Sequence, residues 1–201
     1  MAQALAEKTA DKVDAEHDER KAPKIPASSL QWQAEGFVYR QAFLRLPKGL
    51  VLQDTRATPD TPEQRKGRGE LADMVLKQGA SAAADAFLPK LVGETTKKEN
   101  PGLVQMLEDV ILKTSPRGIA DALAGLAARA DSTPLLREIR VPTLVVCGEE
   151  DVITPVADSE AIQRGIADAK LKVIPKAGHL SNMENSTAFN EALLGFLAAG
   201  F

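Results

Sequence analysis

The sequence predicts an α/β fold in which a short, mostly parallel sheet is interrupted, after an early strand, by a helical insertion. Three observations predict this fold. The last third of the chain alternates apolar, β-branched runs with helical periods. Residues 58–138 are mostly helical in pattern, and one isolated apolar run precedes them at 50–54. Strands that alternate with helices form parallel sheets, because each crossover helix covers a face of the sheet.

Three strands are expected from apolar runs bounded by turn residues. The first is 50–54, which follows Lys48-Gly49. The second is 141–147, a β-branched run that ends at Gly148, and the third is 171–174. Continuous apolar runs of this length are typical of strands buried on both faces of a parallel sheet. A further short strand at 28–33 would lead into a helix.

The helices are expected from their start signals and apolar periods. Thr61 and Pro62 predict a helix start, with threonine as the N-cap and proline at the first helical position. Residues 103–111 carry an apolar stripe at helical spacing, which predicts one buried face. In the last third we expect helices at 155–169 and from 186 to about 198.

These elements divide the chain into three parts. Residues 1–27 form a segment rich in alanine and in charges of both signs, which we expect to be helical or disordered. Residues 28–57 and 134–201 form the α/β core. Residues 58–133 form a helical lid between the two pieces of the core.

Composition excludes several classes of function. The net charge is -3 and 4% of residues are aromatic, so we expect no binding of nucleic acid. The single cysteine, Cys147, excludes an intramolecular disulfide and a cysteine-based metal site. We expect no metal and no cofactor, because a glycine-rich phosphate loop is also missing from the sequence. No apolar run reaches the roughly 20 residues of a membrane span, and no signal peptide is evident, so we expect a cytoplasmic protein.

Two titratable residues follow neighbouring strands of the predicted sheet. Asp151 lies in the run GEEDVITP after the strand at 141–147, and His179 lies in AGH after the next strand. The carboxyl ends of parallel strands are where α/β sheets place their sites. A carboxylate near His179 would hold the imidazole in one tautomer and stabilise its cation. The other histidine, His17, lies in the charged segment and is expected to be solvated.

These runs resemble the C-terminal part of α/β-hydrolases, especially small esterases and enol-lactone hydrolases. The resemblance extends back through GLVLQDTRATPDTPEQR and the lid, and it covers roughly three-quarters of the chain. It implies a truncated α/β-hydrolase fold, with Asp151 as the acid and His179 as the base of a catalytic triad. It also implies that the four strands before the nucleophile, and the loop that supplies one oxyanion amide, are missing.

The sequence departs from this family at the nucleophile. The family places a serine in Gly-x-Ser-x-Gly on a strained turn, and this sequence contains no such motif. Alignment of the helix at 36–47 with the family's helix after the nucleophile puts Gln33 at the serine position. A glutamine amide is not a nucleophile that a histidine activates. Gln31 and Glu35 replace the two glycines that allow the sharp turn.

Other residues that could take part in the chemistry each have a simpler explanation. Ser28 and Ser29 could replace the nucleophile, but they are typical of a turn before a strand. The run 79–83 imitates the motif around Ser81, but its place between two helices predicts a helix cap. Cys147 is expected to be a small core residue. Asp54 could serve as an alternative acid, although aspartate at a strand end commonly forms a turn.

We expect a non-catalytic structural or interaction subunit with a hydrolase fold. The alternatives are an active hydrolase of small carboxylic esters or lactones, whose nucleophile comes from Ser28, Ser29 or a partner chain, and a binder of small molecules. A shortened product of a longer hydrolase gene is a further alternative. A short sheet leaves an edge unpaired near 30–33, so we expect the N-terminal segment, a second copy or another protein to cover it.

Overall fold

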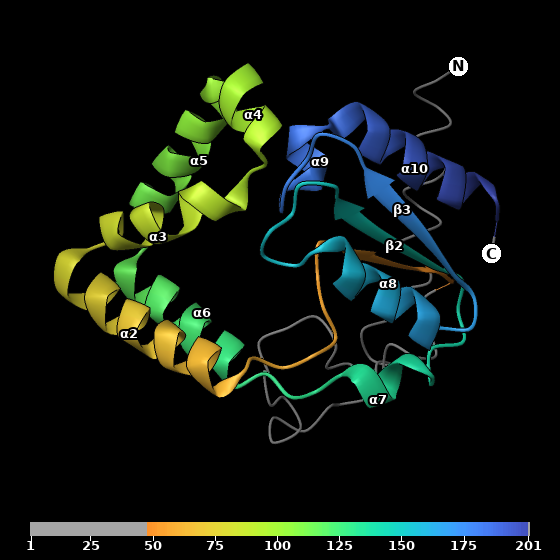
Figure 1. The fold of residues 1–201 in the computed structure, drawn as a ribbon, viewed down its shortest axis with the longest axis horizontal. Helices are drawn as coiled ribbons and strands as arrows, with labels where there is room; N and C mark the ends of the chain where they lie inside the picture. Colours follow the sequence, from red (N-terminus) through yellow and green to blue (C-terminus); the bar gives the residue numbers. More distant parts are fainter. Residues whose placement is uncertain (1–47, 201) are drawn as a thin grey trace, which may run out of the picture. The chain divides into compact units, whose positions relative to one another are not determined.

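The computed structural model describes residues 48–200, and predictions for residues 1–47 lie outside them. Within 48–200 the chain forms three strands and nine helices (Figure 1). In chain order they are β1 (Leu50–Gln53), α2 (Pro62–Gln78), α3 (Ser81–Leu91), α4 (Glu94–Glu99), α5 (Pro101–Lys113), α6 (Pro116–Ala127), α7 (Thr133–Leu136), β2 (Thr143–Gly148), α8 (Val156–Gly165), β3 (Ala169–Ile174), α9 (Ser181–Glu184) and α10 (Ser186–Ala198).

The three strands form a parallel sheet in the order β1-β2-β3, which confirms the predicted α/β fold. Val51 pairs with Leu144 of β2, and Leu144 pairs with Lys170 of β3. The central strand β2 is buried along its whole length, as its apolar sequence predicts. Because all three strands run in the same direction, their carboxyl ends meet at one edge of the sheet.

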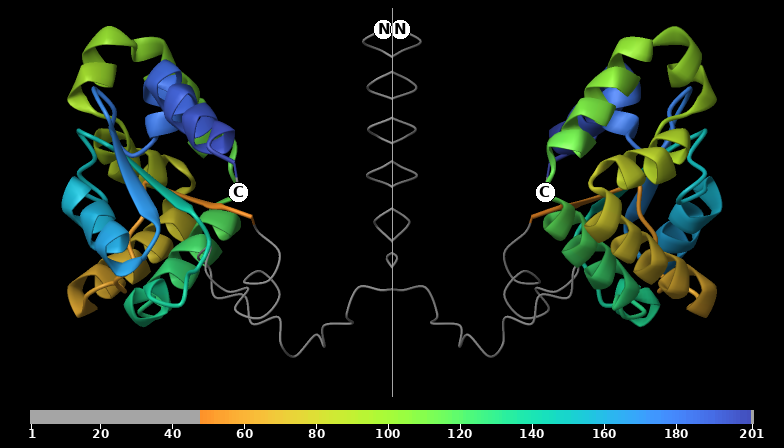
Figure 2. Two further views of the ribbon diagram at one scale, coloured as in Figure 1. Left: turned by 90° about the vertical axis from the view of Figure 1, so that its right-hand side faces the viewer. Right: turned by 90° about the vertical axis from the view of Figure 1, so that its left-hand side faces the viewer.

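Two separate apolar cores cover the two faces of the sheet. Val145 points to the face that packs against Leu136 and Ile162, on α7 and α8. Its neighbour Val146 points to the opposite face, where it packs against Phe189 and Phe196 of α10. This alternation follows from the two-residue period of a strand. The left view of Figure 2 shows α8 and α10 on opposite sides of the sheet.

The five helices α2–α6, here called the helical insert, follow β1 and have a small core of their own. Val75, Ala82 and Ala83 are buried there, and α2 packs against both α3 and α6. The insert lies on the side of the sheet where the strands have their carboxyl ends (Figure 1). The prediction of consecutive helices after the first strand is therefore confirmed.

The first helix of the insert begins where the sequence predicts. The Thr61 hydroxyl accepts from the Gln64 amide, the Gln64 side chain accepts from the Thr61 amide, and Pro62 is the first helical residue. These reciprocal bonds satisfy two amides that the helix leaves without partners. Just before the helix, the buried Asp60 carboxylate pairs with Arg56 and Arg68. The pairs join the segment after β1 to α2.

Several predicted boundaries were wrong. The helix expected at 155–169 ends at Gly165. Strand β3 already begins at Ala169, where it pairs with Thr143 of β2. A Cβ at Gly165 would overlap the Leu136 side chain, so a glycine fits there. The strand expected at 50–54 ends at Gln53, because Asp54 turns the chain with a φ of 45°.

The apolar stripe at 103–111 was also only partly correct. Leu107 is buried, but Met106 and Val110 remain 42% and 57% exposed. The short helices α4, α7 and α9 were not predicted, because four to six residues carry too little periodicity to detect. In the part of the chain that the structure describes, no helix has the length and apolar character needed to cross a membrane.

Candidate functional site

The candidate site is formed by loops that leave the carboxyl ends of the three strands. Asp54 directly follows β1, Asp151 lies in the turn after β2, and His179 lies in the loop after β3. The loops after β2 and β3 are in direct contact. Gly148 allows this contact, because a Cβ there would overlap the carbonyl oxygens of Ala177 and Gly178.

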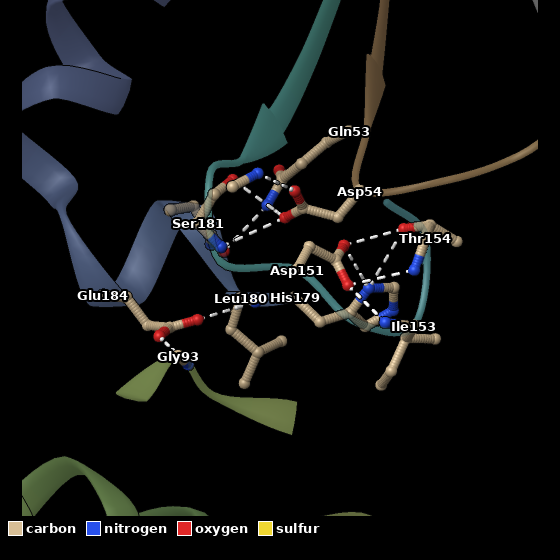
Figure 3. Close-up of polar contacts among 12 residues, drawn as sticks. Gln53, Asp54, Gly93, Asp151, Ile153, Thr154, His179, Leu180, Ser181 and Glu184 are labelled. Carbon is tan, nitrogen blue, oxygen red and sulfur yellow. Dashed lines mark hydrogen bonds and ion pairs between the residues drawn. The ribbon is translucent and has the colours of Figure 1, made fainter. Parts of the chain in front are cut away.

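Asp151 is a buried carboxylate that accepts four hydrogen bonds. Its Oδ1 accepts from the amides of Ile153, at 2.8 Å, and Thr154, at 3.0 Å. Its Oδ2 accepts from the Thr154 hydroxyl at 2.7 Å and contacts His179 Nδ1 at 2.8 Å. The residue is only 5% exposed. The turn after β2 therefore folds around this carboxylate and fixes its direction (Figure 3).

The surroundings of Asp151 keep its carboxylate charged. Burial by itself would raise the pKa of Asp151, because it removes water from the charged form. The hydrogen bonds from His179 and Thr154 outweigh this effect and hold the pKa below its usual value of 3.8. A carboxyl group with a pKa below 3.8 is ionised at neutral pH, so both Asp151 oxygens can accept hydrogen bonds.

His179 is held at its Nδ1 side and is partly open to solvent. Because the Asp151 carboxylate only accepts, Nδ1 carries a proton and donates it. The imidazole side chain is 23% exposed. Among residues 48–200, no hydrogen bond reaches its other nitrogen, Nε2, which therefore has a lone pair available to take a proton. The structure thus brings together the two residues that the sequence singled out.

Thr154 is a member of this group that the sequence analysis missed. Its hydroxyl donates to Asp151 Oδ2 and lies 3.3 Å from His179 Nδ1. The spacing of Asp151 and Thr154, with two residues between them, is typical of an aspartate that accepts from the backbone ahead of it. That spacing was the one available signal. The side-chain contact with His179 could not have been inferred from it.

The Asp54 carboxylate binds Gly148 and Ser181 and makes no hydrogen bond with the imidazole of His179. Its carboxylate accepts from the Gly148 amide at 3.1 Å and from the Ser181 amide and hydroxyl at 3.1 and 2.8 Å. Burial raises the pKa of Asp54, while the bonds from Gln53 and Ser181 partly offset that effect. Asp54 joins the ends of β1 and β2 to α9 (Figure 3). These contacts favour a structural role for Asp54 over the role of an alternative catalytic acid.

The remaining candidates divide into those inside and those outside the described residues. Cys147 is buried in β2, and burial raises the pKa of its thiol, as expected for a core residue. Gly79 ends α2 with a φ of 91° just before Ser81, so the predicted helix cap is confirmed. The residues that lie outside the described part are His17, Ser28, Ser29, Gln31, Gln33 and Glu35.

The arrangement is able to carry out acid–base chemistry on a hydroxyl group or a water molecule. Neutral His179 can accept a proton at Nε2, and the charged Asp151 then stabilises the imidazolium. Between residues 48 and 200, no serine, threonine or cysteine is hydrogen-bonded to Nε2. The same residues hold no group of three or more histidine, cysteine, aspartate or glutamate side chains that could bind a metal ion.

The chain matches the family described as alpha/beta hydrolase fold over residues 9–186. The matched range covers the β1–β3 sheet, the helical insert, Asp151 and His179. It begins inside the segment 1–27, which the sequence analysis placed outside the core.

Curated relatives match the chain over part of its length. It is 32% identical over 122 residues to a 3-oxoadipate enol-lactonase from Acinetobacter baylyi, covering 61% of this chain and 45% of that protein. It is 33% identical over 96 residues to a pimeloyl-[acyl-carrier protein] methyl ester esterase from Neisseria meningitidis, covering 48% of this chain and 37% of that one. The chain thus spans less than half the length of these two relatives.

Solved structures also match. A thermophilic esterase from Thermogutta terrifontis is 38% identical with a TM-score of 0.73, and the match covers 76% of this chain and 56% of that one. An enol-lactonase from Burkholderia xenovorans is 30% identical with a TM-score of 0.68, covering 75% of this chain and 56% of that one.

Proposed function

The chain belongs to the α/β-hydrolase family, and on that premise we propose that Asp151 and His179 are the acid and the base of a site for small carboxylic esters or lactones. We further propose that the chain does not turn over such substrates by itself and acts as a structural or interaction subunit. The observation that carries the first part is the 2.8 Å contact between Asp151 Oδ2 and His179 Nδ1.

The pair fits the chemistry of acyl transfer. His179 would remove the proton of an attacking hydroxyl group through Nε2 and later return it to the leaving group. Asp151 would keep the imidazole in the tautomer with Nδ1 protonated and stabilise its cation, since its own pKa is held low. As His179 takes the proton, the hydroxyl oxygen would attack the carbonyl carbon, and the returned proton would neutralise the leaving oxygen.

The proposed substrate class rests on the relatives. The curated matches include an enol-lactonase and a methyl ester esterase, and the matching structures include an esterase and an enol-lactonase. Esters and lactones share an acyl carbon bonded to a leaving oxygen, so one acid–base pair suits both. The order of identity among these relatives does not favour one substrate within the class.

The second part of the proposal rests on the nucleophile. The sequence has no Gly-x-Ser-x-Gly motif. If the run 36–47 corresponds to the family's helix after the nucleophile, Gln33 stands at the serine position. Without a nucleophile, a triad enzyme keeps only the rate that substrate binding and oxyanion stabilisation supply. We therefore expect the chain alone to be without measurable esterase activity.

A second candidate function is an active hydrolase whose nucleophile comes from Ser28, Ser29 or a partner chain. The observation that favours it is the intact pair, because the Asp151 carboxylate is ionised and His179 Nε2 has no partner among the described residues. Under this alternative, the serine hydroxyl would have to reach Nε2 within hydrogen-bonding distance.

One experiment separates these functions. The purified chain and His179→Ala are compared in hydrolysis of p-nitrophenyl acetate and butyrate, and in labelling by a fluorophosphonate probe. We expect no labelling and no saturable turnover in either protein. Labelling of the unmodified chain, together with turnover lost in His179→Ala, would contradict the proposal. Labelling that then disappears in Ser28→Ala or Ser29→Ala would identify the nucleophile.

A further inference from the structure

Residues 91–96, which run from the last residue of α3 into the first turn of α4, lie directly on the loop that carries His179. The His179 amide donates to the carbonyl oxygen of Leu91 at 3.2 Å. A Cβ at Gly178 would overlap the Gly93 nitrogen and the Val92 carbonyl carbon. The two backbones are therefore in contact, and a glycine at 178 makes this approach sterically feasible. We call this segment the α3–α4 turn.

One carboxylate, Glu184 of α9, binds both the α3–α4 turn and the His179 loop. Its Oε2 accepts from the Gly93 amide and from the Thr96 hydroxyl, each at 2.7 Å. Its Oε1 accepts from the Leu180 amide at 3.0 Å. Figure 3 shows Glu184 between Leu180 and Gly93. Both carboxylate oxygens are thus used, one for each side of the contact.

A second carboxylate joins the same turn to the loop that carries Asp151. Glu150, the neighbour of Asp151, accepts from the Thr95 amide at 2.8 Å and from the Thr95 hydroxyl. Burial would raise the pKa of Glu150, but the bonds from Thr95 outweigh it and hold the pKa below 4.5. The turn after β2 and helix α9, which follows the His179 loop, therefore each contribute one carboxylate to the α3–α4 turn.

The bonds on the His179 side fix the peptide groups before and after this residue. The Leu91 carbonyl binds the His179 amide, and Glu184 binds the Leu180 amide. With both neighbouring amides held, the φ and ψ angles of His179 have little freedom, so its ring stays within reach of Asp151. A loop without these bonds would have to lose more conformational entropy to reach the same geometry.

We propose that Glu184 is a positioning residue, which holds the His179 loop in register with Asp151 by joining it to the α3–α4 turn. Glu184 touches no reacting atom. The inference rests on the proposed function only in treating His179 as a base, because the bonds themselves exist whether or not the chain is active. The helical insert is thereby part of the support of the imidazole.

The test is Glu184→Gln, measured by amide hydrogen exchange and by NMR of the imidazole nitrogens. Glutamine has one acceptor oxygen where glutamate has two, so at least one of the three donors would face an NH₂ group. We expect the Leu180 or Gly93 amide to exchange about tenfold faster, as for the loss of one hydrogen bond to a charged group. The His179 ring signals should also shift. A His17→Gln background leaves one imidazole to observe.

The matched control is Glu191→Gln, which removes an exposed carboxylate from α10. It should leave the exchange at 91–96 and 177–185, and the ring signals, unchanged. Unaltered ring signals in Glu184→Gln, or unaltered exchange of both the Leu180 and the Gly93 amides, would overturn the proposal. If that variant fails to fold, Glu184→Asp replaces it. Aspartate keeps the charge but is one methylene too short to bind both sides, so the same faster exchange is expected, and its absence overturns the proposal.

Failure of this inference is distinguishable from failure of the proposed function. Shifted ring signals in Glu184→Gln would support the positioning of His179 even if the p-nitrophenyl ester assay showed that the chain is an active hydrolase. Conversely, an inactive chain with unaltered ring signals in Glu184→Gln would overturn the positioning alone.

Discussion

Asp151 shows how a buried charge is kept at the residue scale. It accepts from two amides and one hydroxyl of its own turn, in addition to the imidazole. A buried carboxylate without such donors would lose its charge, because burial disfavours the ionised form. The bonds within the turn therefore orient the Asp151 carboxylate toward His179.

The low pKa of Asp151 predicts a specific dependence of stability on pH. Its folded pKa lies below the unfolded value, so its contribution is complete above about pH 4 and is lost as the pH falls through the folded pKa. We expect the difference in unfolding free energy between the unmodified chain and Asp151→Asn to shrink as the pH is lowered from 6 to about 3. Urea unfolding of both proteins at several pH values measures this difference in unfolding free energy. A difference that does not change with pH would contradict the account.

Asp54 and Ser181 give a second prediction at this scale. The Ser181 hydroxyl is fully buried and donates to Asp54 at 2.8 Å. Ser181→Ala removes this donor from a buried carboxylate, which should lower the unfolding free energy by about 1–3 kcal/mol. The control is Ser186→Ala, at an exposed position at the start of α10. This change should alter the unfolding free energy by less than about 0.5 kcal/mol. Chemical denaturation measures both variants. Equal losses of unfolding free energy in Ser181→Ala and Ser186→Ala would show that the Ser181–Asp54 hydrogen bond does not stabilise the fold.

At the scale of elements, the site depends on backbone contacts between loops. Gly148 ends β2 where the loop after β3 crosses it, and Gly178 meets the α3–α4 turn in the same way. A Cβ at either position would overlap backbone atoms, which cannot move aside as a flexible side chain can. The approach of three elements to one point is what places Asp151 beside His179.

Gly148→Ala tests this close approach. The added methyl group would overlap the carbonyl oxygens of Ala177 and Gly178, so we expect a loss of about 1–3 kcal/mol or more in unfolding free energy. The matched control is Gly195→Ala on α10, where nothing lies within 4 Å of the new methyl group. That change should stabilise the helix by about 0.5–1 kcal/mol. A tolerated Gly148→Ala, measured in the same urea titration, would contradict the observed contact.

The sequence predicted the elements with strong local signals. The β2 run is apolar and β-branched, and Thr61 with Pro62 starts α2 as expected. The pair Asp151–His179 was predicted because both residues follow neighbouring strands of a parallel sheet. Glu150, Thr154 and Glu184 were missed as members of the site. Their partners lie up to 91 residues away or depend on side-chain direction, and a local pattern contains neither.

At the scale of the whole molecule, the sheet has an edge that the described residues do not cover. The amides of Leu50 and Asp54 donate toward β2, so those of Val51 and Gln53 point away from it, as alternate residues of a strand do. No partner for them occurs within 48–200. We propose that residues before 48, a second copy or another protein pairs with this edge, because unpaired strand edges favour association.

Light scattering after size-exclusion chromatography, combined with hydrogen exchange, tests this proposal. We expect slow exchange of the Val51 and Gln53 amides, comparable with that of Leu52, which lies within the β1–β2 pairing. An assembly larger than 21.5 kDa would identify a second copy as the cover. A monomer in which both outward amides exchange freely would contradict the proposal.

The central claim is that Asp151 and His179 form an oriented acid–base pair, and the nitrogen-15 NMR signals of the imidazole test it most directly. In the His17→Gln variant at a pH where the ring is neutral, we expect the proton on Nδ1 and an unprotonated Nε2. In Asp151→Asn this preference should be weakened or reversed. A neutral ring with its proton on Nε2, or a tautomer that does not change in Asp151→Asn, would contradict the account.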